Sequence, residues 1–273
     1  MIYDDIEFNS NDEFNRYLLY KYLTIEFKKQ SAKNPSRSAE QMILNNSTNL
    51  FGHNSIAVWL GERNFEFYCL YYLQDAFVAK PDNKNRELAP VHLEIWQELQ
   101  QMFIEDKWDK EEFILPRGSA KTTIINKALT CHQHCYSKSK YTIVIGNKES
   151  DAIQFISDTR KMLGNEYIVK SFGELVVQSK DRTLNKQEIE LNNDTKIQAY
   201  SWGSSVRGTK YDGSRPTLVI LDDILSEKDI LTEGAKEKVV KKYYTEVEEV
   251  GDEAVYRNGK KISPATKFIV LGA

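Results

Sequence analysis

The segment Leu115–Thr123, Leu-Pro-Arg-Gly-Ser-Ala-Lys-Thr-Thr, constrains the fold of this chain more than any other stretch. It follows the apolar run Phe113–Leu115 and precedes a helical pattern at Ile124–Leu129. Small residues let backbone N–H groups close on phosphate oxygens, and the first turn of a helix adds the positive end of its dipole. The order of strand, small-residue turn and helix therefore predicts a phosphate-binding loop.

The side chains of this loop suit a nucleotide with Mg²⁺. Lys121 is placed to reach the β- and γ-phosphates, and the Thr122 hydroxyl can take a Mg²⁺ ligand position. The loop departs from the motif G-x-x-x-x-G-K-[ST], because Leu115 and Ala120 stand where its two glycines would be. Ala120 is small enough to keep the turn if its φ angle is negative. Alone, the loop fits an ordinary strand-turn-helix equally well.

A second signal follows later in the chain. Leu218–Leu221 is an unbroken apolar run, typical of a strand buried on both faces of a parallel sheet, and Asp222 and Asp223 follow it. Carboxylates at that end of a strand lie where ligands bind in open α/β sheets. We expect Asp222 to hold Mg²⁺ through a water and Asp223 to orient or activate the attacking water. The alternative is that the pair only caps the next helix.

The remaining pattern predicts an α/β fold with a mostly parallel central sheet flanked by helices. Further strands are expected at Tyr141–Gly146 and Phe268–Leu271, and a hairpin joins Ile189–Leu191 to Lys196–Tyr200. The first part of the chain is helical and polar. We place a domain boundary in the polar break at Pro81–Arg86, which gives a helical appendage over residues 1–85 and a phosphate-loop domain over residues 86–273.

Composition excludes several classes of protein. The chain has 273 residues, 41% of them hydrophobic and 28% charged, which is typical of a soluble globular protein. No apolar stretch approaches the ~20 residues that span a bilayer. Three cysteines form no disulfide framework and favour a reducing cytoplasm. The net charge of −3 argues against a protein that coats nucleic acid but leaves room for one local basic surface.

Two other clusters favour structural roles. The aromatic stretch Phe65–Phe77 could stack on bases, but no basic residue lies within it, so we expect it to pack the appendage onto the main domain. Cys131, His132, His134 and Cys135 lie on one predicted helix and point in several directions. A zinc site needs ligands that converge, and no second cluster completes one here.

An ordered set of segments resembles the ATPase half of the large terminase subunit of tailed bacteriophages, the motor that packages DNA. The resemblance extends over residues 65–273, and its phosphate-binding loop, like that of the family, has an Arg ahead of a small-residue run. The segments that carry it, with Glu94, are Phe67–Tyr72, Ala89–His92, Pro116–Thr123, Asn147–Ala152, Lys170–Gly173, Val206–Gly208, Arg215–Pro216 and Leu218–Asp223.

This resemblance implies a Mg²⁺-dependent P-loop ATPase that powers translocation of double-stranded DNA into the procapsid. The loop and the acidic strand correspond to the Walker A and Walker B motifs. Arg117, Gly118, Ser119, Ala120, Lys121, Thr122, Thr123 and His92 would contact ATP, and Thr122 and Asp222 would hold Mg²⁺. The family often has Glu where Asp223 stands. The coupling motif, which follows the last strand in the family, cannot be assigned at Gly272-Ala273.

The family also implies partners and a setting. The partners are double-stranded DNA, a portal protein and a small terminase subunit, and the setting is the cytoplasm of an infected bacterium. The working motor would be a homo-oligomeric ring docked on the portal, whereas the isolated chain would be a monomer. The nuclease half of the family has no counterpart in this chain. An arginine is expected to stabilise the charge that spreads over the γ-phosphoryl oxygens in the transition state. We expect Arg207 to reach the site of a neighbouring subunit and Arg117 to act within its own chain, and Arg215 is a competing candidate. The alternative is that Arg207 and Arg215 are solvated charges of an exposed loop, because exposed arginine is common.

Two alternatives stay open. One is a nucleotide-binding module whose altered loop and Asp223 bind ATP without turning it over. The other is a different P-loop DNA translocase or a helicase. Helicase identity would need further motifs after Asp222 and Asp223, and dependence on portal and capsid would separate packaging from other translocation.

Overall fold

A computed structural model describes residues 2–80, 83 and 87–272 of the chain. Contacts within it define two units. Unit 1 is Met1–Asp106 with Gly164–Glu174, and unit 2 is Lys107–Leu163 with Leu175–Ala273. No helix in the described part of the chain is long and apolar enough to cross a membrane.

Unit 1 is almost entirely helical. Polar caps fix where its helices begin, as at Ser10, whose side chain accepts a hydrogen bond from the N–H of Glu13. Its elements are β1 (Ile2–Tyr3), β2 (Ile6–Glu7), α1 (Asn11–Lys29), α2 (Pro35–Asn45), α3 (Ile56–Arg63), α4 (Phe65–Tyr72), α5 (Gln74–Phe77), α6 (Pro90–Phe103) and α9 (Glu166–Phe172).

Helix α6 belongs to unit 1, whereas the sequence pattern grouped it with the phosphate-loop domain. The rings of Phe77 and Trp96 pack edge to face at 5.2 Å. Gln100 on the same helix accepts a hydrogen bond from the N–H of Phe65 and donates one to the carbonyl of Arg63. The division of contacts therefore falls after Asp106 rather than near residue 85. Within Pro81–Arg86, only Asn83 is described.

The aromatic stretch forms the core of unit 1. Every residue of α4 except Glu66 is buried, and the rings of Phe67 and Tyr71 stack at 5.5 Å. Tyr71 also meets Tyr167 of α9 edge to face at 5.3 Å. Because these rings face one another, they have no free surface on which a base could stack.

Unit 2 is built on a six-stranded sheet, which confirms the predicted α/β class. The strand order is β3-β10-β7-β4-β6-β5, and every neighbouring pair is parallel except β5 and β6. The strands are β3 (Lys110–Ile114), β4 (Tyr141–Gly146), β5 (Glu188–Glu190), β6 (Lys196–Ser201), β7 (Leu218–Asp222) and β10 (Lys267–Gly272). The predicted hairpin is the antiparallel pair β5 and β6.

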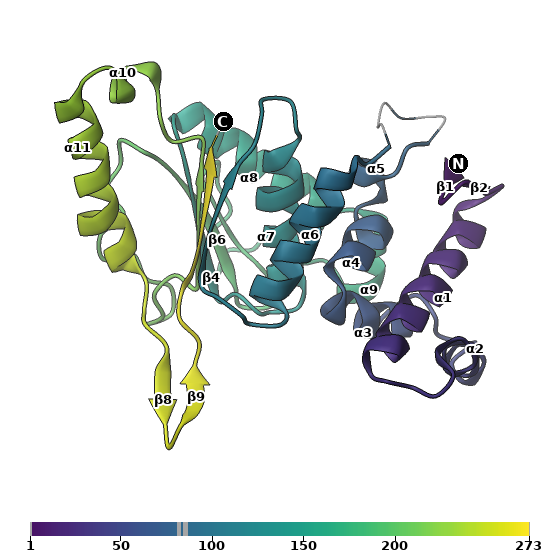
Figure 1. The fold of residues 1–273 in the computed structure, drawn as a ribbon. Coiled ribbons are helices and arrows are strands. Elements are labelled where there is room, and N and C mark those ends of the chain that lie inside the picture. Colours follow the sequence, from purple (N-terminus) through teal and green to yellow (C-terminus); the bar gives the residue numbers. More distant parts are fainter. Residues whose placement is uncertain (1, 81–82, 84–86, 273) are drawn as a thin grey trace. The chain divides into compact units, whose positions relative to one another are not determined.

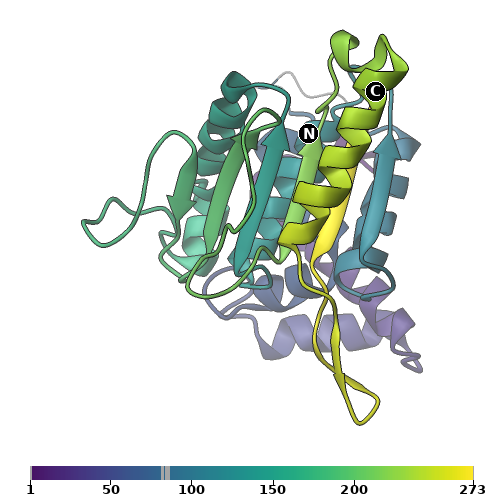
Figure 2. The ribbon, with the colours of Figure 1, turned by 90° about the vertical axis from the view of Figure 1, so that its left-hand side faces the viewer.

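Helices cover both faces of this sheet (Figure 1). Helices α7 and α8 lie along one face and α11 along the other, and the parallel strands run side by side in Figure 2. The helices are η1 (Thr122–Lys127), α7 (Ala128–Cys135), α8 (Glu149–Leu163), α10 (Glu227–Ile230), α11 (Glu233–Lys242), η2 (Tyr243–Val247) and η3 (Glu248–Val250). A separate two-stranded ribbon consists of β8 (Val255–Arg257) and β9 (Lys260–Ser263).

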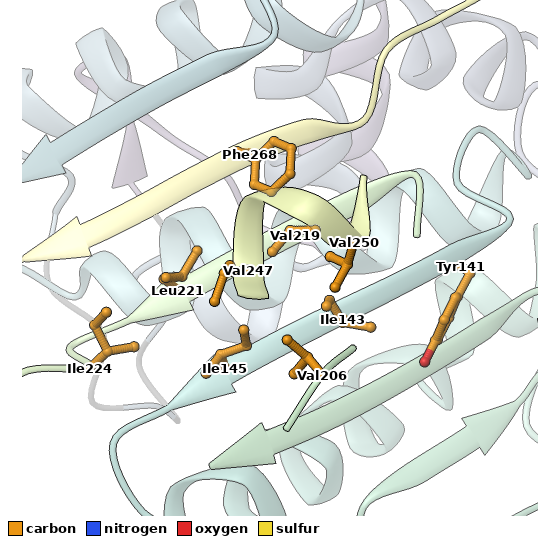
Figure 3. Packing of buried hydrophobic residues seen from close by; sticks show 10 residues of the cluster. All are labelled: Tyr141, Ile143, Ile145, Val206, Val219, Leu221, Ile224, Val247, Val250 and Phe268. Atoms are coloured by element: carbon orange, nitrogen blue, oxygen red, sulfur yellow. The ribbon is translucent and has the colours of Figure 1, made fainter. Parts of the chain in front are cut away.

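One face of the sheet packs against η2 and η3. Val247 and Val250 of these helices meet alternate residues of the strands, such as Ile143, Val219 and Phe268 (Figure 3). Alternation arises because successive side chains in a strand point to opposite faces. The packed sheet therefore holds the ends of its strands in register with one another.

Candidate functional site

The carboxyl ends of the parallel strands form one row. In register, Gly272 of β10 lies beside Ile114 of β3, and Leu271 lies beside Asp222 of β7. Asp222 also lies beside Gly146 of β4. One strand, β10, thus separates the strand that leads into the phosphate-binding loop from the acidic strand. The loop and the two carboxylates meet at the edge where ligands bind in open α/β sheets.

The loop itself turns through two left-handed residues. Gly118 has φ of +83°, which favours glycine, and Ala120 has φ of +56°. The condition under which alanine was expected to keep the turn, a negative φ angle, is therefore not met. Alanine occupies the strained conformation that the glycine of the motif would adopt without penalty.

Two pairs of side chains link the loop to the acidic strand. The Lys121 Nζ lies 3.1 Å from Asp223 Oδ2, and the Thr122 Oγ1 donates a hydrogen bond to Asp222 Oδ1 at 3.2 Å. Lys121 is 6% exposed, so its charge is held away from bulk water beside the carboxylate. Lys121 and Thr122 of the loop are therefore each in contact with one of the two carboxylates.

Asn126 is a fifth member of this cluster, which the sequence analysis missed. Its Nδ2 donates to Asp222 Oδ2 at 3.1 Å, so the two oxygens of Asp222 have one partner each. The signal was present, because Asn126 follows Thr122 by four residues and so shares its face of a helix. The helix starts as the π-helical segment η1, and single π turns inside helices often occur at functional sites.

Burial raises the pKa of the Asp222 carboxyl, while the hydrogen bonds from Asn126 and Thr122 oppose that rise. A carboxylate and a hydroxyl are oxygen donors of the kind that Mg²⁺ prefers. The donor set of Thr122 and Asp222 thus fits a magnesium ion.

Two polar atoms of the site also lack a hydrogen-bond partner within the described part of the chain. They are the buried Ser119 Oγ of the loop and Asn126 Oδ1. Among the same residues, no hydrogen bond is formed by the backbone N–H groups of Gly118 and Ala120. Unused donors in a loop ahead of a helix are what a phosphate group requires.

Asp223 lines two pockets that offer space for a ligand. One open pocket of about 360 Å³ is lined by Thr122, Asn126 and Asp222 as well as Asp223. A second, of about 790 Å³, is lined by Arg117, Asp223 and Gly272 and by residues of α11 and η2. Ligand pockets typically span about 300–1,000 Å³, so either volume is in the usual range.

The three candidate arginines have different surroundings. Arg117 lines the larger pocket beside Asp223. Arg207 donates to the carbonyl of Thr245 at 2.9 Å, and Arg215 donates to the carbonyl of Glu249 at 2.8 Å. Arg207 and Arg215 therefore hold the segment after α11 in place. The roles of Arg117 in cis and Arg207 in trans stay predictions.

Two further predictions concern histidines. His92 lies in unit 1, where its Nδ1 accepts a hydrogen bond from the N–H of Ala89, and its contact with ATP stays a prediction. His134 lies between the hydroxyls of Thr195 and Thr142, and the ring of His132 packs against Tyr136. Within the described residues, no cluster of three or more His, Cys, Asp or Glu side chains could hold a metal ion.

Comparison with known proteins adds one structural similarity. No protein-family model matches the chain, and no curated protein matches it. Among solved structures, the large terminase of bacteriophage HK97 is similar, with a TM-score of 0.44 and 14% sequence identity. The match covers 78% of this chain and 37% of the terminase chain, so this chain spans less than two thirds of that protein.

Proposed function

We propose that unit 2 binds ATP with Mg²⁺ and hydrolyses it to ADP and phosphate. The observation that carries the proposal is the double contact between loop and strand, Lys121 with Asp223 and Thr122 with Asp222. The unused polar groups of Gly118, Ser119 and Ala120 support it, because they lie where the phosphates would bind.

Each residue has a distinct task in this proposal. Lys121 and the loop backbone bind the β- and γ-phosphates, and Ser119 supplies a further hydroxyl donor. Thr122 and Asp222 hold Mg²⁺, and Asn126 fixes the orientation of the Asp222 carboxylate. When bound, Mg²⁺ neutralises charge on the phosphate oxygens. Asp223 accepts a hydrogen bond from the attacking water and aims it at the γ-phosphorus.

An arginine contributes to the rate in this scheme. Charge spreads over the γ-phosphoryl oxygens in the transition state, and an arginine there increases the rate by ~10³–10⁵ in related enzymes. Arg117 would act within the chain, and Arg207 would reach the site of a neighbouring copy. A monomer should then hydrolyse ATP slowly, and its specific activity should rise with protein concentration.

We further propose that this activity drives translocation of double-stranded DNA, as the motor domain of a terminase-like packaging machine. The ordered segments that resemble large terminases support this step, from Pro116–Thr123 through Leu218–Asp223. By the same resemblance, DNA, a portal protein and a small terminase subunit are the proposed partners, and the host cytoplasm is the proposed location.

Replacement of Lys121 tests the ATP site. We expect Lys121→Ala to weaken binding of Mg-ATP beyond detection in a calorimetric titration, because the only lysine of the loop contacts the phosphates. Lys161→Ala is the matched control, because Lys161 lies exposed on α8. Unchanged affinity for Mg-ATP in Lys121→Ala would overturn the assignment of the loop.

A further inference from the structure

The ribbon of β8 and β9 stands apart from the rest of unit 2. All seven of its strand residues are exposed. Asn258 and Gly259 join the strands with φ angles of +51° and +75°, the signs that a tight type I′ hairpin turn requires. Figures 1 and 2 show the ribbon extending away from the sheet of its own unit. An isolated two-stranded ribbon buries little surface and adds little to stability.

The tip of the ribbon places two positive charges face to face. Arg257 and Lys260 are register partners across the strands, so their side chains lie on the same face. Like charges directly opposite one another destabilise a strand pair. No ion pair to either side chain forms within the described part of the chain. A polyanion bound at the tip would offset this repulsion.

The base of the ribbon is firmly held. Asp252 and Thr266 face each other there, and the N–H of each bonds to an oxygen of the other, at 2.8 and 2.9 Å. Arg215 donates to the carbonyl of Gly251 and pairs with Asp252 at 3.4 Å. The negative charge of Asp252 is thus compensated at the base, while the cations stand at the tip.

The ribbon continues directly into β10, which ends at the candidate ATP site. At that end, Leu271 accepts a hydrogen bond from the N–H of Asp223 at 3.0 Å, and Gly272 accepts one from the N–H of Leu115 at 3.1 Å. A single strand therefore joins the ribbon to both halves of the site. A load on the ribbon would reach Asp223 and the phosphate-binding loop through this strand.

We propose that the β8–β9 ribbon is the surface that contacts the phosphate backbone of double-stranded DNA. Lys and Arg side chains contact and neutralise DNA phosphates, and the major groove is wide enough for a two-stranded ribbon. Val255, Tyr256 and Ile262 of the ribbon are also exposed. DNA is the proposed partner because Arg257 and Lys260 stand opposite each other at the tip without an ion-pair partner among the described residues. The inference rests on the proposed DNA-translocating function and names its contact surface.

Neutralising the tip tests this inference. The double variant Arg257→Ala/Lys260→Ala removes both charges from exposed positions, and we expect its thermal midpoint to be no lower than that of the wild type, because the removed charges repel each other. Binding of a fluorescent DNA duplex is measured by anisotropy over a series of salt concentrations. Loss of two phosphate contacts should reduce the slope of log K against log salt by about 2 and weaken binding by about tenfold or more.

A matched control separates the tip from general surface charge. Lys33→Ala/Arg37→Ala removes the same charge from exposed positions of unit 1 and should leave DNA affinity unchanged. Equal affinity and slope in the tip variant and the wild type would overturn the inference, as would a wild-type chain that binds no duplex. ATP turnover without DNA is measured in parallel. If the wild type does not hydrolyse ATP but its DNA affinity depends on the ribbon, the result would count only against the proposed ATPase activity and not against the ribbon as the DNA contact.

Discussion

At the scale of single residues, the strained loop is the feature that most sets this site apart. Ala120 adopts φ of +56°, immediately before Lys121. A residue with a side chain carries a penalty of about 1–2 kcal/mol in this region, which glycine avoids. The left-handed turn at Ala120 leads directly into Lys121, which precedes helix η1 and whose side chain meets Asp223.

Ala120→Gly should raise the free energy of unfolding by about 0.5–1 kcal/mol, since relief of the strain outweighs the extra freedom of glycine in the unfolded chain. Urea denaturation followed by circular dichroism measures the change. Ala235→Gly, in the ordinary helix α11, should have the opposite sign, with a loss of up to about 1 kcal/mol. If both variants lose stability, Ala120 carries no strain that glycine can relieve.

At the scale of elements, the contact between η3 and β10 fixes the base of the ribbon. A Cβ atom on Gly251 would lie 2.8 Å from Thr266 Cβ and 2.9 Å from a ring carbon of Phe268. Thr266 Cβ is bonded directly to the backbone, and the ring of Phe268 is buried in the core of the sheet. Gly251 is therefore what allows the segment after η3 to approach the first residues of β10.

Gly251→Ala should lower the free energy of unfolding by about 1–3 kcal/mol, the usual cost of overpacking. Gly234→Ala is the control, because its Cβ would enter open space on helix α11 and should raise stability by a few tenths up to about 1 kcal/mol. Denaturation midpoints of the two variants measure the difference. Equal midpoints would show that the approach at Gly251 relaxes without cost.

Much of this architecture could be read from the sequence. The apolar run Leu218–Leu221 predicts a buried strand because leucine, valine and isoleucine side chains fill both faces, and the structure confirms it as β7, which extends one residue further to Asp222. The left-handed Ala120 could not be predicted, because nothing in the residue itself favours that conformation. The position of α6 also escaped prediction, since it depends on a long-range contact of Trp96 with Phe77.

At the scale of the whole molecule, a buried polar network joins the strands of unit 2 at their amino ends. His134 bonds to the hydroxyls of Thr195 and Thr142, and Ser139 links Thr142 to Thr217. Burial lowers the pKa of His134 to about 3. The folded chain therefore keeps this imidazole neutral, whereas an unfolded chain protonates it near pH 6.5.

The free energy of unfolding should fall as the pH drops from about 6.5 towards 3, because only the unfolded state gains the proton of His134. One proton contributes about 1.4 kcal/mol per pH unit in that range. Between about pH 7 and 5.5, the wild type should lose about 1 kcal/mol more than His134→Gln in urea denaturation. Parallel losses in the two proteins would contradict the pKa of a neutral, buried His134.

Release of phosphate from Mg-ATP by the purified chain, compared with Asp223→Asn, is the most direct test of the central claim. Asn keeps the size of the side chain but cannot accept a proton from water. We expect slow turnover in the wild type that rises with protein concentration, and none in Asp223→Asn at unchanged affinity for Mg-ATP. Turnover that survives in Asp223→Asn, or tight binding without turnover in the wild type at every concentration, would contradict an ATPase that uses Asp223 as its base.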